Sequence, residues 1–244
     1  MASPNEITAE IWRGGPEGGA YQSFSVPRYE SQTVLDVVAW IQQEADPTLS
    51  YRFACRVGMC GSCGMMVNGV PRWTCRTHVD KVLNDGHLQV GPLRNLPIIK
   101  DLAADMDPFF DKWVAAGGVF HPTKTRDDEM APVTHAEPER AAADKGIECI
   151  NCGVCYASCD TVAGNPDYLG PAALNRAWTL WNDAKDGAGD HILDAVSGAG
   201  GCHSCHSMGS CAQYCPNELN PLEGIAGLKR ATAKRSLRRA LWGR

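Results

Sequence analysis

The chain has 244 residues, of which 44% are hydrophobic and 21% are charged, a normal composition for a globular protein. Its formal net charge of −5 disfavours general nucleic-acid binding. No apolar run approaches the roughly 18 residues of a membrane span. The first residues lack the basic and apolar regions of a secretory signal, which predicts a reducing compartment. The 12 cysteines therefore indicate metal or redox ligands rather than disulfides.

The first hundred residues predict a small sheet packed on one helix. Residues 6–13 alternate in hydrophobicity and 21–26 resume the pattern after a glycine-rich turn, which predicts a β-hairpin. Residues 33–45 have apolar side chains at helical spacing, which predicts a helix. Three further strands are predicted at 65–70, 73–79 and 87–93.

Helices dominate the predicted structure of the remaining chain. Residues 101–117 predict a helical connector that is broken near Pro108. Residues 121–145 are rich in acidic residues, Thr, Pro and Ala, which predicts an extended linker. Apolar periodicity predicts helices at 171–181 and 222–242.

The cysteines divide the chain in the same way, because four lie between 55 and 75 and eight lie after 148. We therefore expect an α+β protein with two cluster-bearing domains. The predicted organisation is a mixed α and β domain over 1–104, a helical connector and linker over 105–145, and a helical domain over 146–244.

The first thiol set is Cys55, Cys60, Cys63 and Cys75. Its C-x4-C-x2-C opening is the plant-type spacing for a 2Fe–2S cluster. Small residues between the cysteines let the loop wrap tightly and aim backbone N–H groups at the sulfurs. Zinc is the competing interpretation, but zinc sites usually pair two C-x2-C units, which this spacing fits less well.

Two further runs repeat one spacing in the second half of the chain. The first run is Cys149, Cys152, Cys155 and Cys159, and the second is Cys205, Met208, Cys211 and Cys215. In two-cluster ferredoxins, the fourth cysteine of each run ligates the other cluster. This rule predicts a second thiol set for a 4Fe–4S cluster: Cys149, Cys152, Cys155 and Cys215.

The third thiol set is then Cys159, Cys205 and Cys211, with Met208 in the place of a fourth cysteine. A cubane corner without a thiolate readily loses its iron, so we expect a 3Fe–4S cluster there. Cys202 lies outside the repeat, and two interpretations remain open for it. It is either a spare fourth ligand or a buried thiol with no electronic role.

The last predicted helix is strongly basic. Seven of the 23 Lys and Arg residues follow residue 226, and no acidic residue does: Lys229, Arg230, Lys234, Arg235, Arg238, Arg239 and Arg244. Such a helix suggests contact with anionic lipid or an acidic partner. The alternative is a solvated helix whose cations interact favourably with its C-terminal dipole.

Three motifs together resemble the iron–sulfur subunit of succinate dehydrogenase and quinol:fumarate reductase: CRVGMCGSCGMMVNG, CINCGVCYASC and CHSMGSCAQYCP. The resemblance covers nearly the whole chain. It implies a β-grasp, plant-ferredoxin-like domain followed by an all-α, bacterial-ferredoxin-like domain. It also implies 2Fe–2S, 4Fe–4S and 3Fe–4S clusters in series.

The resemblance further implies a role as an electron carrier in a membrane-bound succinate:quinone oxidoreductase. The dicarboxylate chemistry would belong to a flavoprotein partner with FAD, so we expect no catalytic residue on this chain. The quinone would lie against membrane anchor subunits on the cytoplasmic face of the membrane. His206 and Lys229 match family positions near that quinone. Alternatives are the same role in a quinol:fumarate reductase or a soluble fumarate reductase, or a zinc-rich structural module.

Overall fold

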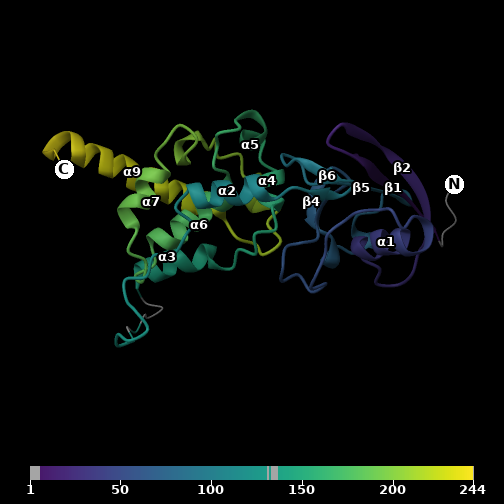
Figure 1. Cartoon of the computed structure of the whole chain (residues 1–244), viewed down its shortest axis with the longest axis horizontal. Helices are drawn as coiled ribbons and strands as arrows, with labels where there is room; N and C mark the ends of the chain where they lie inside the picture. Colours follow the sequence, from purple (N-terminus) through teal and green to yellow (C-terminus); the bar gives the residue numbers. More distant parts are fainter. Residues whose placement is uncertain (1–5, 131, 133–136, 244) are drawn as a thin grey trace. The chain divides into compact units, whose positions relative to one another are not determined.

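The structure is a computed structural model that describes residues 6–130, 132 and 137–243 (Figure 1). Its contacts define two compact units, each of which is described by itself below. The first unit comprises Met1–Met106 together with Ile150–Ser158, and the second comprises Asp107–Cys149 together with Cys159–Arg244. The membership of Ile150–Ser158 in the first unit is not visible in the sequence pattern.

A mixed five-stranded sheet in the order β2-β1-β5-β3-β4 forms the centre of the first unit. The strands are β1 (Glu6–Gly15), β2 (Gly18–Pro27), β3 (Gly64–Val67), β4 (Val70–Trp73) and β5 (His87–Gly91). The predicted hairpin is confirmed, since β1 and β2 pair antiparallel with Ile7 opposite Val26. Strand β5 runs parallel to β1, while β3 pairs antiparallel with both β4 and β5.

Helix α1 (Val34–Trp40) covers one face of this sheet. The Thr33 side chain caps its N-terminus by accepting the Asp36 N–H, and Asp36 accepts the Thr33 N–H in return. The buried face of α1 packs into a core with residues of β1 and β5. A π-helical turn at Ile41–Ala45 extends α1, so the predicted helix over 33–45 is confirmed.

The expected strand over 73–79 is wrong beyond its first residue. Strand β4 ends at Trp73, and a 3₁₀ turn follows at Thr74–Arg76. The N–H and hydroxyl of Thr74 both donate to the Cys63 carbonyl, at 3.1 and 2.9 Å. These bonds continue the β3–β4 pairing by one residue and hold the backbone just before Cys75 against Cys63, and the 3₁₀ turn then ends the strand.

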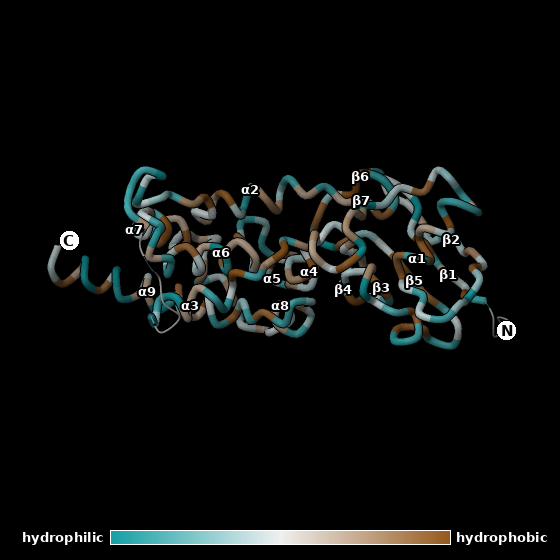
Figure 2. Tube along the Cα trace, turned by 90° about the horizontal axis from the view of Figure 1, so that it is seen from below, coloured by the Kyte–Doolittle hydropathy of each residue, from teal (hydrophilic) through white to brown (hydrophobic). Residues whose placement is uncertain are grey.

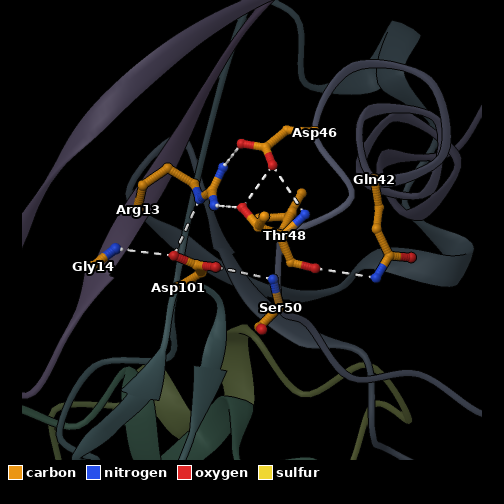
Figure 3. Close-up of polar contacts among 8 residues, drawn as sticks. Arg13, Gly14, Gln42, Asp46, Thr48, Ser50 and Asp101 are labelled. Atoms are coloured by element: carbon orange, nitrogen blue, oxygen red, sulfur yellow. Dashed lines mark hydrogen bonds and ion pairs between the residues drawn. The ribbon is translucent and has the colours of Figure 1, made fainter.

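A buried charge network joins the two ends of the first unit (Figure 3). Asp101 is almost fully buried, and its carboxylate accepts the N–H groups of Gly14 and Ser50 at 3.0 and 2.9 Å. The Arg13 guanidinium lies between the Asp101 and Asp46 carboxylates. The network therefore connects β1 to the loop after α1 and to the end of the unit.

Residues 98–104 form a short hairpin, β6 (Ile98–Lys100) and β7 (Ala103–Ala104), which the sequence analysis did not predict. Helix α2 (Asp107–Ala115) begins later than expected. Pro108 stands in its first turn, where a missing N–H costs nothing, so this proline starts the helix instead of breaking it.

Helices α3 (Pro138–Ile147), α5 (Asp160–Gly164), α6 (Pro171–Trp181), α7 (Gly189–Ala195), α8 (Ser210–Gln213) and α9 (Pro221–Trp242) complete the second unit. Helix α6 is central and packs on α2, α3, α7 and α9. The Trp178 ring lies on Gly224 and Gly227 of α9, and its Nε1 donates to Ala142. The predictions of α6 and α9 are confirmed.

The expected linker over 121–145 is wrong at its C-terminal end, where α3 begins with Pro138. Ala143 and Gly146 of α3 are buried, and the Asn175 side chain donates to the Gly146 carbonyl at 3.0 Å. Tertiary packing therefore stabilises a helix that composition alone disfavours. Residues 131 and 133–136 of this stretch, like Arg244, lie outside the described residues.

Candidate iron–sulfur cluster sites

The first thiol set is brought together within the first unit, on the loop before β3 and the 3₁₀ turn after β4. Backbone N–H groups point at its sulfurs: Cys55 donates to the Cys60 Sγ at 3.5 Å, while Val57 and Met59 donate to the Cys55 Sγ at 3.4 and 3.3 Å. At the other end, the Cys63 and Cys75 side chains hydrogen-bond to each other.

The electrostatics of this loop favour anionic sulfur at its exposed rim. The N–H of Cys55 and the hydroxyl and N–H of Ser62 lower the pKa of Cys60 to about 6. Burial and the neighbouring Cys63 raise the pKa of Cys75 to about 12. Since a cluster binds thiolates, its iron would supply the charge that stabilises the buried sulfurs. This donor set fits a 2Fe–2S cluster.

Glycines let the loop wrap as the sequence predicts. Gly58 and Gly61 have φ of 77° and 69°, in the region that glycine adopts without strain. A Cβ at Gly61 would lie 2.6 Å from the Ile150 carbonyl oxygen and 2.8 Å from the Cys152 Cα. The first cysteine loop therefore touches the backbone of the second motif, inside the first unit.

The second thiol set has members in both units. Cys152 and Cys155 lie in the first unit, in or beside α4 (Val154–Ala157), while Cys149 and Cys215 lie in the second. Within the second unit, the Asn217 side chain donates to the Glu148 carbonyl at 2.7 Å. This bond holds the chain just after Cys215 against the chain just before Cys149, as crossed ligation requires.

The two cysteine runs, 149–159 and 205–215, share one pattern of backbone angles. Asn151 and Gly153 have positive φ of 54° and 75°, and Ser207 and Gly209 occupy the same register with φ of 58° and 93°. A single-turn helix follows in each run, α4 in 149–159 and α8 in 205–215. This equivalence supports the register of the two runs, in which Met208 stands at the position of Cys152.

The third thiol set gathers around a small cavity in the second unit. Cys159, Cys205 and Cys211 line it together with Met208 and Tyr168. The Ser207 N–H donates to the Cys205 Sγ at 3.4 Å. Burial, and the neighbouring sulfurs of this set, raise the pKa of Cys211 to about 12. Three sulfurs that line one small cavity are a donor set that fits an anionic iron–sulfur cluster.

Tyr168 is a member of this site that the sequence analysis missed. It is only 1% exposed, and its hydroxyl hydrogen-bonds to Cys205. Burial and the nearby sulfurs raise the pKa of Tyr168, so the phenol stays protonated and acts as a donor. No cysteine spacing pointed to this residue, which lies between two helices just before α6.

The three other residues that the sequence singles out, Lys229, His206 and Cys202, lie on or near α9 and the loop of Cys205. The Lys229 Nζ donates to the Cys205 carbonyl at 2.7 Å, and His206 is exposed on the loop that follows. Cys202 is fully buried, with its Sγ 3.8 Å from the Thr232 hydroxyl. It does not line the cavity of the third thiol set, which supports the interpretation of Cys202 as a buried thiol.

A site for a single metal ion requires several ligand side chains grouped around one point. Within residues 6–130, 132 and 137–243, no three His, Cys, Asp or Glu side chains are grouped to hold one metal ion. A cluster distributes its thiolates over several iron atoms, so its ligands need not converge on one point.

Among the helices that the structure describes, none combines the length and hydropathy required to cross a bilayer.

These thiol sets, carried by a sheet domain and then by a helical domain, define an iron–sulfur electron-transfer protein. Residues 8–111 match the family model of the 2Fe–2S iron–sulfur cluster binding domain, and residues 148–220 match that of the 4Fe–4S dicluster domain. The expected α+β fold, with a sheet domain before a helical one, is thereby confirmed.

Known proteins narrow the class to one family. The chain is 35% identical over 249 residues to the fumarate reductase iron–sulfur subunit of Mycobacterium tuberculosis, with 98% of each chain covered. It is 34% identical over 198 residues to the succinate dehydrogenase iron–sulfur subunit of Paracoccus denitrificans, covering 80% of this chain and 74% of that one. The chain belongs to the iron–sulfur subunits of the succinate dehydrogenase and fumarate reductase family, and it is an electron-transfer subunit.

A solved structure shares the fold. A chain of the Mycobacterium smegmatis Sdh1 complex in the apo form superposes with a TM-score of 0.82, at 24% identity, over 96% of this chain and 98% of that one.

Proposed function

We propose that this chain is the electron-transfer subunit of a membrane-bound succinate:quinone oxidoreductase. It would pass single electrons between a flavoprotein subunit that carries FAD and a quinone in the membrane. The first, second and third thiol sets would hold 2Fe–2S, 4Fe–4S and 3Fe–4S clusters. When bound, these clusters supply one-electron redox chemistry, and the protein's part is to hold, space and tune them.

The close approach of the first two motifs carries this proposal. Because Gly61 touches the backbone of Ile150 and Cys152, the loop of the first thiol set is adjacent to a cysteine of the second motif. Short spacing between successive carriers is what a chain of electron transfers requires. An isolated structural metal site has no need for such contact.

The third thiol set supports a 3Fe–4S cluster at the end of the series. It offers three cysteine sulfurs, and Met208, at the second position of the repeated run, is 63% exposed. A thioether is a neutral and weaker ligand than a thiolate, so the fourth iron would have no anionic partner. The Tyr168 hydroxyl and the Ser207 N–H would stabilise the negative charge on Cys205.

We place the quinone beside the third thiol set, near His206 and Lys229. Lys229 is a cation already held against the Cys205 carbonyl, and an exposed histidine follows Cys205 in the chain. Either side chain can donate a hydrogen bond or a proton to a quinone oxygen. Membrane anchor subunits would hold this end of the chain on the cytoplasmic face of the membrane.

Iron and sulfide analysis of the purified complex, with EPR of oxidised and reduced samples, tests the cluster assignment. We expect about nine iron atoms per chain and three separate signals. Retained zinc without EPR signals would establish the zinc module instead. Lys229→Met and His206→Ala should slow quinone reduction more than reduction of a soluble dye. Equal losses with both acceptors would contradict a quinone role.

A quinol:fumarate reductase is the second candidate, since the relatives carry both names. Electron flow through the same sites would then run from quinol to fumarate. Assays of the complex in both directions, with quinones of high and low potential, distinguish the two enzymes. A complex that is active with thiols and not retained by membranes would favour the soluble alternative.

A further inference from the structure

The last turns of α9 extend beyond the body of the second unit. The buried residues of this helix end at Thr232, so about 15 Å of helix follows the last residue of its core contact. Figure 1 shows this end of α9 projecting past α7 to the C-terminus. We call residues 234–242 the α9 tip.

The α9 tip is anchored at its base by an acidic helix. Arg235 makes two hydrogen bonds to the Asp194 carboxylate of α7, at 2.8 and 2.9 Å, and a third to the Asp190 carbonyl at 3.0 Å. Arg239 reaches the same Asp194 at 3.4 Å. These contacts fix one side of the tip against α7 and leave the opposite side open.

That open side presents two leucines to solvent, since Leu237 and Leu241 are 60% and 61% exposed. Trp242, in the last turn, is 71% exposed, but it lies seven residues after Arg235 and so on the face of that arginine. Leu237 and Leu241 are four residues apart and therefore share one face of the helix. Figure 2 shows hydrophobic and hydrophilic residues alternating along this end of α9. Exposed leucines that share one helix face are costly in water unless a partner covers them.

Cations without partners lie on the same side. Lys234 and Arg238 are exposed, and neither forms an ion pair with any residue that the structure describes. Lys234 is three residues before Leu237 and Arg238 is three residues before Leu241, so each cation lies beside one of the leucines. Along α9 itself, no acidic residue follows Glu223.

We propose that the α9 tip lies on the surface of an anionic lipid bilayer. Its two leucines would enter the interface, and its unpaired cations would bind lipid phosphates. An acidic protein surface would satisfy the cations and leave the leucines in water, whereas an apolar groove would do the reverse. An anionic bilayer satisfies both. This inference does not depend on which clusters the chain holds.

Co-sedimentation of the full chain with protein-free vesicles tests the inference. We expect binding to mixed phosphatidylcholine–phosphatidylglycerol vesicles and little binding to phosphatidylcholine alone. Lys234→Gln/Arg238→Gln should lower the partition coefficient on anionic vesicles about 30-fold. Leu237→Ser/Leu241→Ser should lower it at least tenfold, even at low salt. High salt should weaken binding of the wild type, because it screens the cations.

Lys81→Gln/Arg126→Gln is the matched control, since it removes two exposed cations elsewhere and should bind like wild type. Far-UV circular dichroism and the cluster absorption verify that each variant is folded. The inference is overturned if wild type ignores anionic vesicles, or if both double variants bind them normally. It is also overturned if the leucine variant only prevents assembly with partner subunits, because a protein would then cover this face.

Discussion

The buried hydroxyl of Tyr168 donates a hydrogen bond to Cys205, on the wall of the cavity that holds the third thiol set. A donor to a thiolate ligand stabilises the more negative, reduced state of a cluster and so raises its reduction potential. Tyr168 is therefore placed to tune the carrier nearest the proposed quinone position, although it ligates nothing itself.

We expect Tyr168→Phe to lower the reduction potential of the third cluster and leave the others unchanged. One neutral hydrogen bond contributes on the order of 1 kcal/mol, which corresponds to roughly 40 mV for a one-electron couple. EPR-monitored redox titration measures the shift, with the 2Fe–2S signal of the same sample as an internal control. A potential that stays constant would show that the bond has no electronic effect.

Met208→Cys should convert the third cluster from 3Fe–4S toward 4Fe–4S. The variant places a thiol at the register position of Cys152, beside the three sulfurs that already line the cavity. The oxidised 3Fe–4S EPR signal should disappear, and iron content should rise by about one atom per chain. Met208→Ala supplies no sulfur and should keep the original signal. An unchanged signal in Met208→Cys would contradict the alignment of the two runs.

Gly61→Ala should destabilise the loop of the first thiol set and reduce its cluster occupancy. The new Cβ would combine a positive φ with contacts of 2.6 and 2.8 Å to the second motif, and both neighbours are backbone atoms. We expect a loss of roughly 2–3 kcal/mol in unfolding free energy and a weaker 2Fe–2S signal.

Gly69→Ala is the matched control, because Gly69 also has a positive φ of 77° but has open space around it. It should cost only the backbone strain, roughly 1 kcal/mol. If both variants behave alike, contact with the second motif contributes nothing.

Arg13→Met should destabilise the first unit by roughly 3 kcal/mol, because it leaves the buried Asp101 carboxylate without its cation. Arg28→Met, which removes an exposed pair with Asp80, should cost less than about 1 kcal/mol. Chemical denaturation of the two variants measures the difference. If Arg13→Met loses no more unfolding free energy than Arg28→Met, the network does not contribute to the stability of the first unit.

Acid should weaken the same network. The Thr48 hydroxyl, followed by Arg13, lowers the pKa of Asp46 to about 2. Because the pKa in the folded state lies below that of an unfolded aspartate, about 4, this stabilisation is complete above pH 4. It is lost as the pH falls toward 2. Between pH 5 and 2, the wild type should therefore lose more unfolding free energy than Arg13→Met. Chemical denaturation of both proteins at each pH measures this difference.

Much of the fold follows from local pattern. Alternation of hydrophobic residues predicts the β1–β2 hairpin, and apolar periodicity predicts α1, α6 and α9, because each element buries one regular face. The missed elements have no such pattern. Helix α3 depends on the packing of Ala143 and Gly146, and the turn at Cys75 depends on two hydrogen bonds to Cys63.

The sequence by itself determined which sulfurs are available and in what register, because covalent spacing sets how far apart a loop can hold its ligands. The sequence directly shows the repeated runs, the methionine at 208 in place of a cysteine, and the basic end of α9. Only the tertiary structure decided what surrounds those sulfurs. Tyr168 reaches Cys205 from 37 positions away, and Gly61 touches Cys152 across 91, through contacts that no local periodicity encodes. Donors, burial and close approach of this kind come from segments distant in the chain, so they exist only once the chain is folded.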